Sequence, residues 1–202
     1  MEAFVFENKK IIIAGGGHAG IEAALAISRM GGSCIIVTMD KHALGRLSCN
    51  PAVGGLGKSH LVKEIDALGG IMGSCSDSSG IQFKVLNKTK GRAVWANRIQ
   101  VDKKKYPKII NHAIKQHKSI SLIEGEVVEV KTTGSQVTSV ILRGGNKITC
   151  SSVVVTCGTF LSGLIHIGEN SFPAGRMGEK PSVGLTESLK NLGHSMGRLK
   201  TG

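Results

Sequence analysis

The first forty residues contain two short apolar runs separated by a segment of helical composition. Residues 9–14 and 33–38 are rich in β-branched side chains, and this pattern predicts two strands buried in a parallel sheet. Residues 19–30 are rich in Ala, Leu and Ile and contain no glycine after Gly20, which predicts a helix. The order of strand, helix and strand predicts a βαβ unit.

Two further helices are predicted downstream. Residues 58–68 predict a helix that ends at a pair of glycines, and one of its faces carries Leu61, Ile65 and Leu68. Residues 102–118 predict another helix, in which Pro107 must lie in or near the first turn or else kink the helix.

The second half of the chain is richer in strands. Runs separated by polar or glycine-rich turns predict a small antiparallel meander, and they span residues 120–124, 126–131, 137–142 and 147–150. Residues 152–156 predict one more buried strand. The sequence therefore predicts an α/β, Rossmann-like domain with a parallel sheet and an inserted antiparallel β-meander. We expect this domain to cover residues 1–161, with the meander at 120–150, and residues 162–202 to be a return segment or the start of a second, truncated domain.

A glycine-rich fingerprint joins the first strand to the first helix. Its residues match the pattern G-x-G-x-x-G and are Gly15, Gly16, Gly17, His18, Ala19 and Gly20. The first glycine permits a tight turn, the second lets the backbone approach a pyrophosphate, and the third allows the helix to pack closely on the strand. The helix N-terminus favours negative charge. Between a strand and a helix, this pattern favours dinucleotide binding over a merely structural turn.

Two other positions extend the dinucleotide hypothesis. The second strand of such folds usually ends in an acidic residue that binds the ribose, but Thr38 stands at that place and Asp40 follows it. Either side chain is a candidate for a ribose hydroxyl. The strand that ends at Cys157 and Gly158 resembles the second fingerprint of flavoproteins with two dinucleotide domains, where it passes under the flavin phosphates. The alternative is an ordinary buried strand.

The loop after the second strand is a near match to a P-loop. Residues 52–59 fit the pattern except that Ala52 replaces the first glycine, and Asn50-Pro51 rather than a strand leads into it, which argues against an NTPase. The backbone N–H groups of this loop, with Asn50 beside them, still suit the phosphates or the ring of a cofactor. Cys49 lies close to the helix start and to Lys58, so it is either an activated nucleophile or an inert buried thiol.

The composition narrows the class of protein. The chain has 202 residues, of which 41% are hydrophobic and 20% charged, and this balance indicates a globular domain. Five scattered cysteines without a C-x-x-C pair predict reduced thiols, with no disulfide framework and no metal site. We find no secretory signal and no apolar run long enough to cross a bilayer. We therefore expect a cytoplasmic protein without a membrane contact, with an organellar location as the alternative.

The formal net charge of +12 suits a polyanionic partner. Basic residues dominate positions 84–118, where Asp102 is the single acid. We predict RNA contacts for Lys90, Arg92 and Arg98. Trp95 lies among them and could stack on a base. For the later lysines, 103–118, RNA contact and a simple solvated helix face stay equally open.

Together these segments resemble the MnmG (GidA) family, the tRNA-modifying flavoenzymes of bacteria and organelles. The most specific match is Ser-Cys-Asn-Pro-Ala-Val-Gly-Gly-Leu-Gly-Lys at residues 48–58, which continues as far as Gly70. Shorter matches lie at residues 80–83, 157–161, 165–168 and 193–202. The resemblance runs from about Lys10 to the last residue.

The resemblance implies a FAD-dependent enzyme that forms 5-carboxymethylaminomethyluridine at the tRNA wobble position, together with a GTPase partner. It also implies NADH as the reductant, a methylene-folate donor and a homodimer. In such an enzyme residues 15–20 would bind the FAD pyrophosphate, the backbone of Val127 would hold the adenine, and Ser182 would contact FAD. Cys49 matches a family cysteine proposed to act near the flavin.

The chain also departs from the family. It lacks the NADH fingerprint and the C-terminal helical domain of the much longer family enzymes, and Arg92 and Trp95 stand where the family more often has a proline and an arginine. Two alternatives are therefore kept. A generic FAD and NAD(P)H oxidoreductase would need a redox C-x-x-C or an acid–base pair, and neither is evident. A non-catalytic nucleic-acid-binding module would leave the glycine fingerprint without a purpose.

Overall fold

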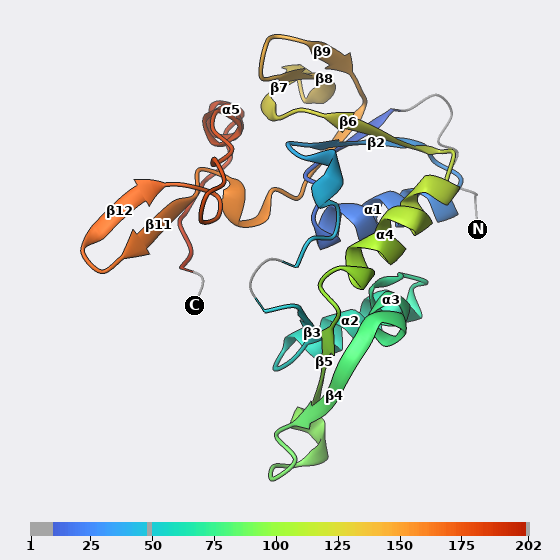
Figure 1. Ribbon diagram of the computed structural model, residues 1–202. Coiled ribbons are helices and arrows are strands. Elements are labelled where there is room, and N and C mark those ends of the chain that lie inside the picture. Colours follow the sequence, from blue (N-terminus) through green and yellow to red (C-terminus); the bar gives the residue numbers. More distant parts are fainter. Residues whose placement is uncertain (1–9, 48–49, 201–202) are drawn as a thin grey trace.

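A parallel sheet lies at the centre of the fold. The computed structural model describes residues 10–47 and 50–200 (Figure 1). The sheet has the strand order β10-β1-β2-β6, and all of its pairings are parallel. Its strands are β1 (Ile11–Ala14), β2 (Cys34–Thr38), β6 (Ile120–Glu124) and β10 (Ser152–Val155). Helix α1 (His18–Arg29) connects β1 to β2, so the predicted βαβ unit is confirmed.

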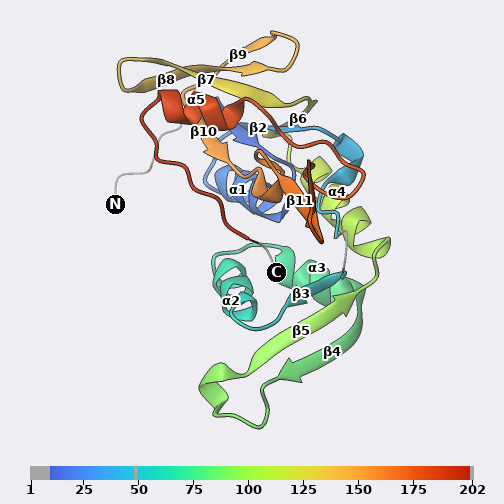
Figure 2. The ribbon, with the colours of Figure 1, turned by 90° about the vertical axis from the view of Figure 1, so that its left-hand side faces the viewer.

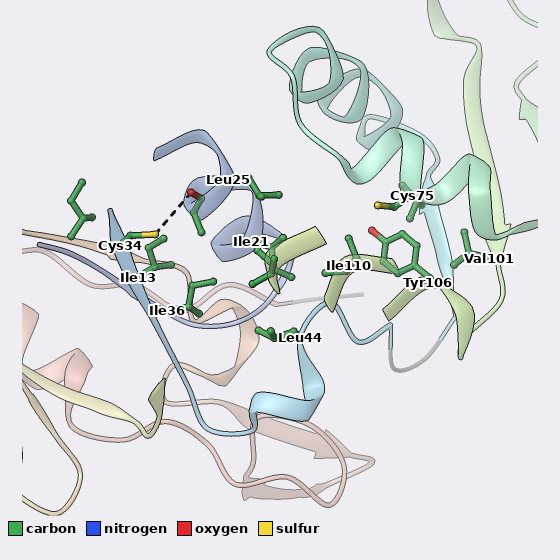
Figure 3. Close-up of a cluster of buried hydrophobic side chains, with 14 residues drawn as sticks. Ile13, Ile21, Leu25, Cys34, Ile36, Leu44, Cys75, Val101, Tyr106 and Ile110 are labelled. Atoms are coloured by element: carbon green, nitrogen blue, oxygen red, sulfur yellow. Dashed lines mark hydrogen bonds between the residues drawn. The ribbon is translucent and has the colours of Figure 1, made fainter. Parts of the chain in front are cut away.

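The two faces of this sheet build two separate cores. In β1, Ile11 and Ile13 belong to the core under α1, whereas Ile12 and Ala14 belong to the core on the opposite face. The α1 core extends away from the sheet as far as Cys75, Val101 and Tyr106, and the side chain of Tyr106 is fully buried (Figure 3). Because neighbouring side chains of a strand point to opposite faces, a run that is apolar throughout must be covered on both sides.

The antiparallel meander covers the second face. It consists of β7 (Val127–Thr133), β8 (Gln136–Leu142) and β9 (Lys147–Thr149), in that order. The predicted meander strand at 120–124 is wrong, because this segment is β6 and pairs in parallel with β2. It follows a helix that crosses back along the sheet, and such a crossover delivers the next strand parallel to the first.

The helix before β6 is α4 (Lys105–Gln116), and Pro107 lies in its first turn as predicted. Proline is tolerated there because the first N–H groups of a helix have no intrahelical acceptor. A short helix near the C-terminal end of the sequence, α5 (Leu185–Asn191), packs against the meander. Leu185 is buried in the meander core, and the Ser188 hydroxyl accepts a hydrogen bond from the Val130 amide at 2.9 Å.

A second, smaller layer lies below the parallel sheet in both views (Figures 1 and 2). It contains an antiparallel sheet in the order β3-β5-β4, formed by β3 (Ala52–Gly54), β4 (Gly80–Leu86) and β5 (Ala96–Val101). Helices α2 (Lys58–Ala67) and α3 (Met72–Ser79) pack on it. The sequence predicted α2 but neither α3 nor the hairpin of β4 and β5, whose far end projects from the body of the molecule.

The predicted apolar face of α2 is only partly buried. Leu61 and Leu68 are 58% and 80% exposed, and Ile65 is half-buried.

After β10 the chain forms a further hairpin, β11 (Leu164–Ile167) and β12 (Asn170–Pro173), which is a two-stranded sheet of its own. Within residues 10–47 and 50–200, no helix combines the length and the apolar character needed to cross a membrane.

The arrangement of the cores predicts which isoleucines carry the stability of the fold. Ile36 in β2 is fully buried, so Ile36→Ala should lower the free energy of unfolding by roughly 2–5 kcal/mol. Ile167 in β11 is 52% exposed, and the matched substitution Ile167→Ala should cost about 0.5 kcal/mol or less. Urea denaturation of both variants measures the difference. Equal losses would contradict this assignment of the core.

Candidate functional site

A cavity of about 260 Å³ lies where β1, β2 and β10 end and α1 begins. In open α/β sheets, ligands bind in this place, outside the carboxyl ends of the strands. Most of the residues predicted to hold a cofactor line the cavity, and these are Gly15, Gly16, Gly17, His18, Thr38, Val127, Gly158 and Ser182. Segments more than a hundred residues apart therefore meet at one site.

The three fingerprint glycines differ in their surroundings. Gly15 has φ +122°, and a Cβ there would lie 2.6 Å from the Thr156 carbonyl oxygen. A Cβ on Gly20 would lie 2.0 Å from the Gly15 carbonyl oxygen, so Gly20 allows α1 to pack against the turn. Gly17 has ordinary φ and nothing within 4 Å of a Cβ position, so its open side belongs to the cavity. Gly15 and Gly20 are therefore required by close contacts, whereas the Cβ position of Gly17 on the cavity wall is open.

The first turn of α1 offers hydrogen-bond donors to the cavity. Gly17 is its N-cap, and no side chain caps the helix. The first intrahelical bond runs from the Ile21 amide to the Gly17 carbonyl at 3.0 Å, which leaves the preceding amides without helical acceptors. Such amides, together with the helix dipole, favour a phosphate group.

His18 contributes no charge to this turn. Burial lowers the pKa of His18, so its ring is neutral at neutral pH. The ring packs against Tyr106 with a centroid distance of 5.6 Å, and its Nε2 finds no hydrogen-bond partner in the described part of the chain. The attraction for an anion therefore comes from the backbone rather than from the imidazole.

Thr38 and Asp40 stand at the end of β2, and both line the cavity. The Thr38 hydroxyl donates a 3.3 Å bond to the Asp40 carbonyl and lines the cavity. The Asp40 carboxylate accepts from the His42 amide at 2.8 Å and pairs with Arg46 at 2.7 Å. Asp40 is thus held by its own loop, whereas the Thr38 oxygen has an acceptor site without such an ion pair; both stay candidates for a ribose hydroxyl.

Ion pairs hold the segment after β12 against this edge of the cavity. Arg46 also pairs with Glu179 at 3.2 Å, and Arg176 reaches the same carboxylate at 3.2 Å. The Arg176 guanidinium stacks over the Phe160 ring, 5.4 Å from its centroid. Sequence reasoning did not find Arg46, Arg176 or Glu179, because nothing local to them indicates that positions 133 residues apart meet.

Glu126 fixes the opposite wall. Its carboxylate accepts hydrogen bonds from the Val183 amide at 2.8 Å and from Arg143 Nη2 at 2.9 Å. Burial opposes ionisation of this carboxyl, but the hydrogen bonds from Arg143 and Val183 outweigh it and hold the pKa of Glu126 below its usual range. The contact places buried Ser182, next to Val183, on the same cavity as Val127. Glu126 was also missed from the sequence.

The end of β10 closes the floor of the cavity. The Thr156 hydroxyl lies 3.1 Å from the carbonyl oxygens of both Ala14 and Gly15, which ties β10 to the fingerprint turn. Burial, and after it the nearby Glu126 carboxylate, raise the pKa of Cys157 to about 11. At neutral pH this cysteine is a thiol and not a nucleophilic thiolate. Gly158 follows it and lines the cavity, as predicted from the strand.

The remaining predicted residues lie elsewhere. Ala19 and Gly20 are not on the cavity wall, and Cys49 lies outside the described residues. Asn50 and Arg98 line a second cavity of about 610 Å³ between β3, β5 and α2. The near match to a P-loop is excluded by its geometry, because Ala52–Gly54 form a strand antiparallel to β5 inside the motif.

Lys90 and Arg92 lie in the connection between β4 and β5, at the projecting end of the hairpin. The Trp95 indole N–H donates to the Lys90 carbonyl at 3.0 Å, and the Arg92 guanidinium lies 5.8 Å from the Trp95 ring centroid. These contacts order the connection and present a basic, partly aromatic surface. The predicted RNA-binding residues therefore do not form one site, since Arg98 is in the second cavity.

Comparison with known proteins gives consistent matches over nearly the whole chain. Residues 10–202 match the model of a family described as glucose inhibited division protein A. A curated relative from Campylobacter hominis, named tRNA uridine 5-carboxymethylaminomethyl modification enzyme MnmG, is 50% identical over 95% of this chain and 30% of its own length. A relative of the same name from Geobacter sulfurreducens is 48% identical over 95% of this chain and 31% of its own length.

The similarity extends to solved structures. The form II crystal structure of Aquifex aeolicus GidA superposes with a TM-score of 0.84 and 43% identity, and the match covers 94% of this chain and 31% of that one. The chain thus spans about three tenths of the length of the curated relatives it matches.

The contacts of Glu126 predict a pH-dependent contribution to stability. Glu126→Gln should lower the free energy of unfolding by roughly 1–3 kcal/mol at pH 7, because charge-assisted hydrogen bonds are lost. Since folding depresses the pKa, this stabilisation is complete above the ordinary carboxyl pKa of about 4.5 and is lost as the pH falls through the lower folded value. Denaturation of both proteins from pH 7 downward should show the gap closing.

The matched control is Glu129→Gln, which removes an exposed ion pair with Lys131. It should change the free energy of unfolding by about 0.5 kcal/mol or less at any pH. If the two variants behaved alike, Glu126 would not be the anchor described above.

Proposed function

Because this chain belongs to the glucose inhibited division protein A family, we propose that it is the FAD-binding part of a tRNA-modifying flavoenzyme of the MnmG type. The observation that supports this most strongly is the cavity at the start of α1. It joins the glycine fingerprint to Thr38, Val127, Gly158 and Ser182 in one site. The family match and the relatives' names support the same conclusion.

The residues present fit a dinucleotide. The open side of Gly17 and the unpaired amides of the first turn of α1 suit its pyrophosphate. We assign the ribose to Thr38 and the adenine to the backbone of Val127, with Ser182 as a further contact. A cavity of about 260 Å³ is small for a ligand pocket, so it encloses only part of such a cofactor. Bound FAD would supply the redox chemistry through its flavin ring, and these residues would position it.

The full reaction belongs to a longer protein than this chain. For that protein we propose formation of 5-carboxymethylaminomethyluridine at the tRNA wobble position, with a GTPase partner, NADH as reductant and a methylene-folate donor. A homodimer and a cytoplasmic location are part of the same proposal. We also propose that the FAD domain ends near Leu161 and that residues 162–202 are either a return segment or the start of a second, truncated domain. The return of α5 to the meander favours a return segment.

RNA contact is proposed for the projecting end of the β4–β5 hairpin. Lys90 and Arg92 offer charges to phosphate groups, and Trp95 offers a ring for stacking on an unpaired base. Arg98 is placed in the second cavity, beside Asn50, where it would meet a substrate group rather than the RNA backbone. A role for Cys49 near the flavin stays a proposal from the resemblance alone.

Two glycine variants test the cofactor site. Gly17→Ala adds a methyl group to the open side of the turn, so it should weaken FAD binding about tenfold or more while the fold is kept. Its cost in stability should stay near 1 kcal/mol, as for alanine at a helix N-cap. Gly20→Ala pushes a Cβ into the turn and should lower stability and FAD binding together. Thermal unfolding and equilibrium dialysis with FAD separate the two quantities.

The comparison between the variants decides between two views of the fingerprint. If Gly17→Ala bound FAD as tightly as the unchanged chain, the turn would be structural only, and the placement of the pyrophosphate at Gly17 would be wrong. The view of the chain as a nucleic-acid-binding module without a cofactor predicts that neither the unchanged chain nor Gly17→Ala binds FAD, and that result would overturn the cofactor proposal.

A further inference from the structure

Helix α4 has one apolar face and one strongly basic face. Tyr106, Ile110 and Ile114 are buried in the core under the parallel sheet. The opposite face is exposed and carries a row of basic residues, called here the α4 row, which consists of Lys105, Lys108, His112 and Lys115. Exposed Lys104 precedes this row and exposed Lys118 follows it.

Within the part of the chain that the structure describes, Lys108 and Lys115 form no ion pair with a carboxylate, whereas the charges of Lys104 and Lys105 interact with that of Asp102. Among the described residues, the ion pairs involve other basic side chains, namely Lys41, Arg46, Lys131, Arg143, Arg176 and Lys190. The nearest acid in sequence, Asp102, is turned to the backbone instead. Its carboxylate accepts from the amides of Lys104 and Lys105 at 2.7 and 2.9 Å, and these bonds lower the pKa of Asp102.

This arrangement is unfavourable for the helix itself. Like charges three or four residues apart repel each other, and cations at a helix N-terminus oppose its dipole. Lys108 follows Lys104 by four residues and Lys105 by three, and all of them lie at the N-terminus of α4, so both effects act on them. A polyanion bound along the row would relieve both costs, because its phosphates would supply the missing counter-charges.

The row differs from the hairpin surface in the contacts it can make. From Lys105 to Lys115 it extends about 15 Å along a straight helix, at about 1.5 Å per residue. Helix α4 contains one residue of the Phe, Tyr and Trp class, Tyr106, and it is buried on the opposite face. The row therefore has no exposed Phe, Tyr or Trp for base stacking. A rigid line of lysines with one small imidazole, His112, suits the regular phosphate backbone of a duplex, whereas the hairpin with Trp95 suits unpaired bases.

We propose that the α4 row is a second RNA-binding surface, which contacts the phosphate backbone of a duplex stem while the hairpin end contacts a single-stranded loop. The proposal rests on the proposed function, since it assumes a folded RNA as the substrate. β5 leads directly from the hairpin into α4, so one continuous stretch of chain would follow the RNA from loop to stem (Figure 1).

A matched pair of double variants of the 202-residue chain tests this proposal. Lys108→Gln with Lys115→Gln removes two charges from the row, and Lys10→Gln with Lys147→Gln removes two exposed charges elsewhere. The probes are a labelled RNA duplex of about 16 base pairs and a single-stranded oligouridylate, titrated between about 50 and 200 mM KCl. Fluorescence anisotropy gives the affinities, and thermal unfolding checks that all variants keep their fold.

For the α4 variant we expect the duplex affinity to fall about tenfold, and the slope of log K against log salt to become shallower by about 2. Affinity for the single strand should change less than twofold, and the control variant should match the unchanged chain with both probes. A third variant, Lys90→Gln with Arg92→Gln, should show the reverse preference and lose single-strand affinity.

Other outcomes overturn the proposal in distinguishable ways. If the α4 variant loses no more duplex affinity than the control while the hairpin variant loses single-strand affinity, the α4 surface is wrong and the proposed function stands. If the unchanged chain binds neither RNA, both proposals fail. If it binds phosphatidylserine vesicles as tightly as duplex RNA, and the α4 variant weakens both equally, the row is a general anion surface and not an RNA site.

Discussion

The close approach of α1 to the ends of β1 and β10 is the constraint on which the nucleotide cavity depends. Gly20 makes the approach possible, because any side chain there would collide with the Gly15 carbonyl. The Thr156 hydroxyl then binds the same turn from the side of β10. With the turn held from both sides, Gly17 and His18 at the start of α1 lie on the cavity wall. Burial lowers the pKa of His18, so this residue brings no charge to the first position of the helix.

Local signals in the sequence predicted the parts of the fold that local interactions determine. Short apolar runs predicted β1, β2 and β10, and the fingerprint predicted the start of α1. The sequence did not reveal α3, whose composition is mostly Gly, Ser and Asp, or the β4–β5 hairpin, whose strands mix polar and apolar residues. The prediction also placed β6 in the antiparallel meander instead of the parallel sheet, because an apolar run does not indicate which strand it pairs with. Glu126 and Arg46 were missed for a similar reason, since their partners lie 57 and 133 residues away.

The charges of the chain divide into two groups with different uses. Around the cavity, Arg46 and Arg176 share the carboxylate of Glu179, so these cations hold protein segments together. On α4 and at the end of the β4–β5 hairpin, the cations lack such pairs within the described ranges, and their field is directed outward. In the proposed assignments, backbone amides would bind a small phosphate ligand, and basic side chains without ion pairs would bind a large polyanion. A flavoenzyme that acts on RNA needs both.

The central claim is that the cavity at the start of α1 holds FAD, and the most direct measurement is the absorption spectrum of the purified, desalted chain. The account predicts flavin bands, or their appearance after incubation with FAD and a second desalting step, and release of intact FAD on heating. A folded chain that stays colourless in both cases would contradict it.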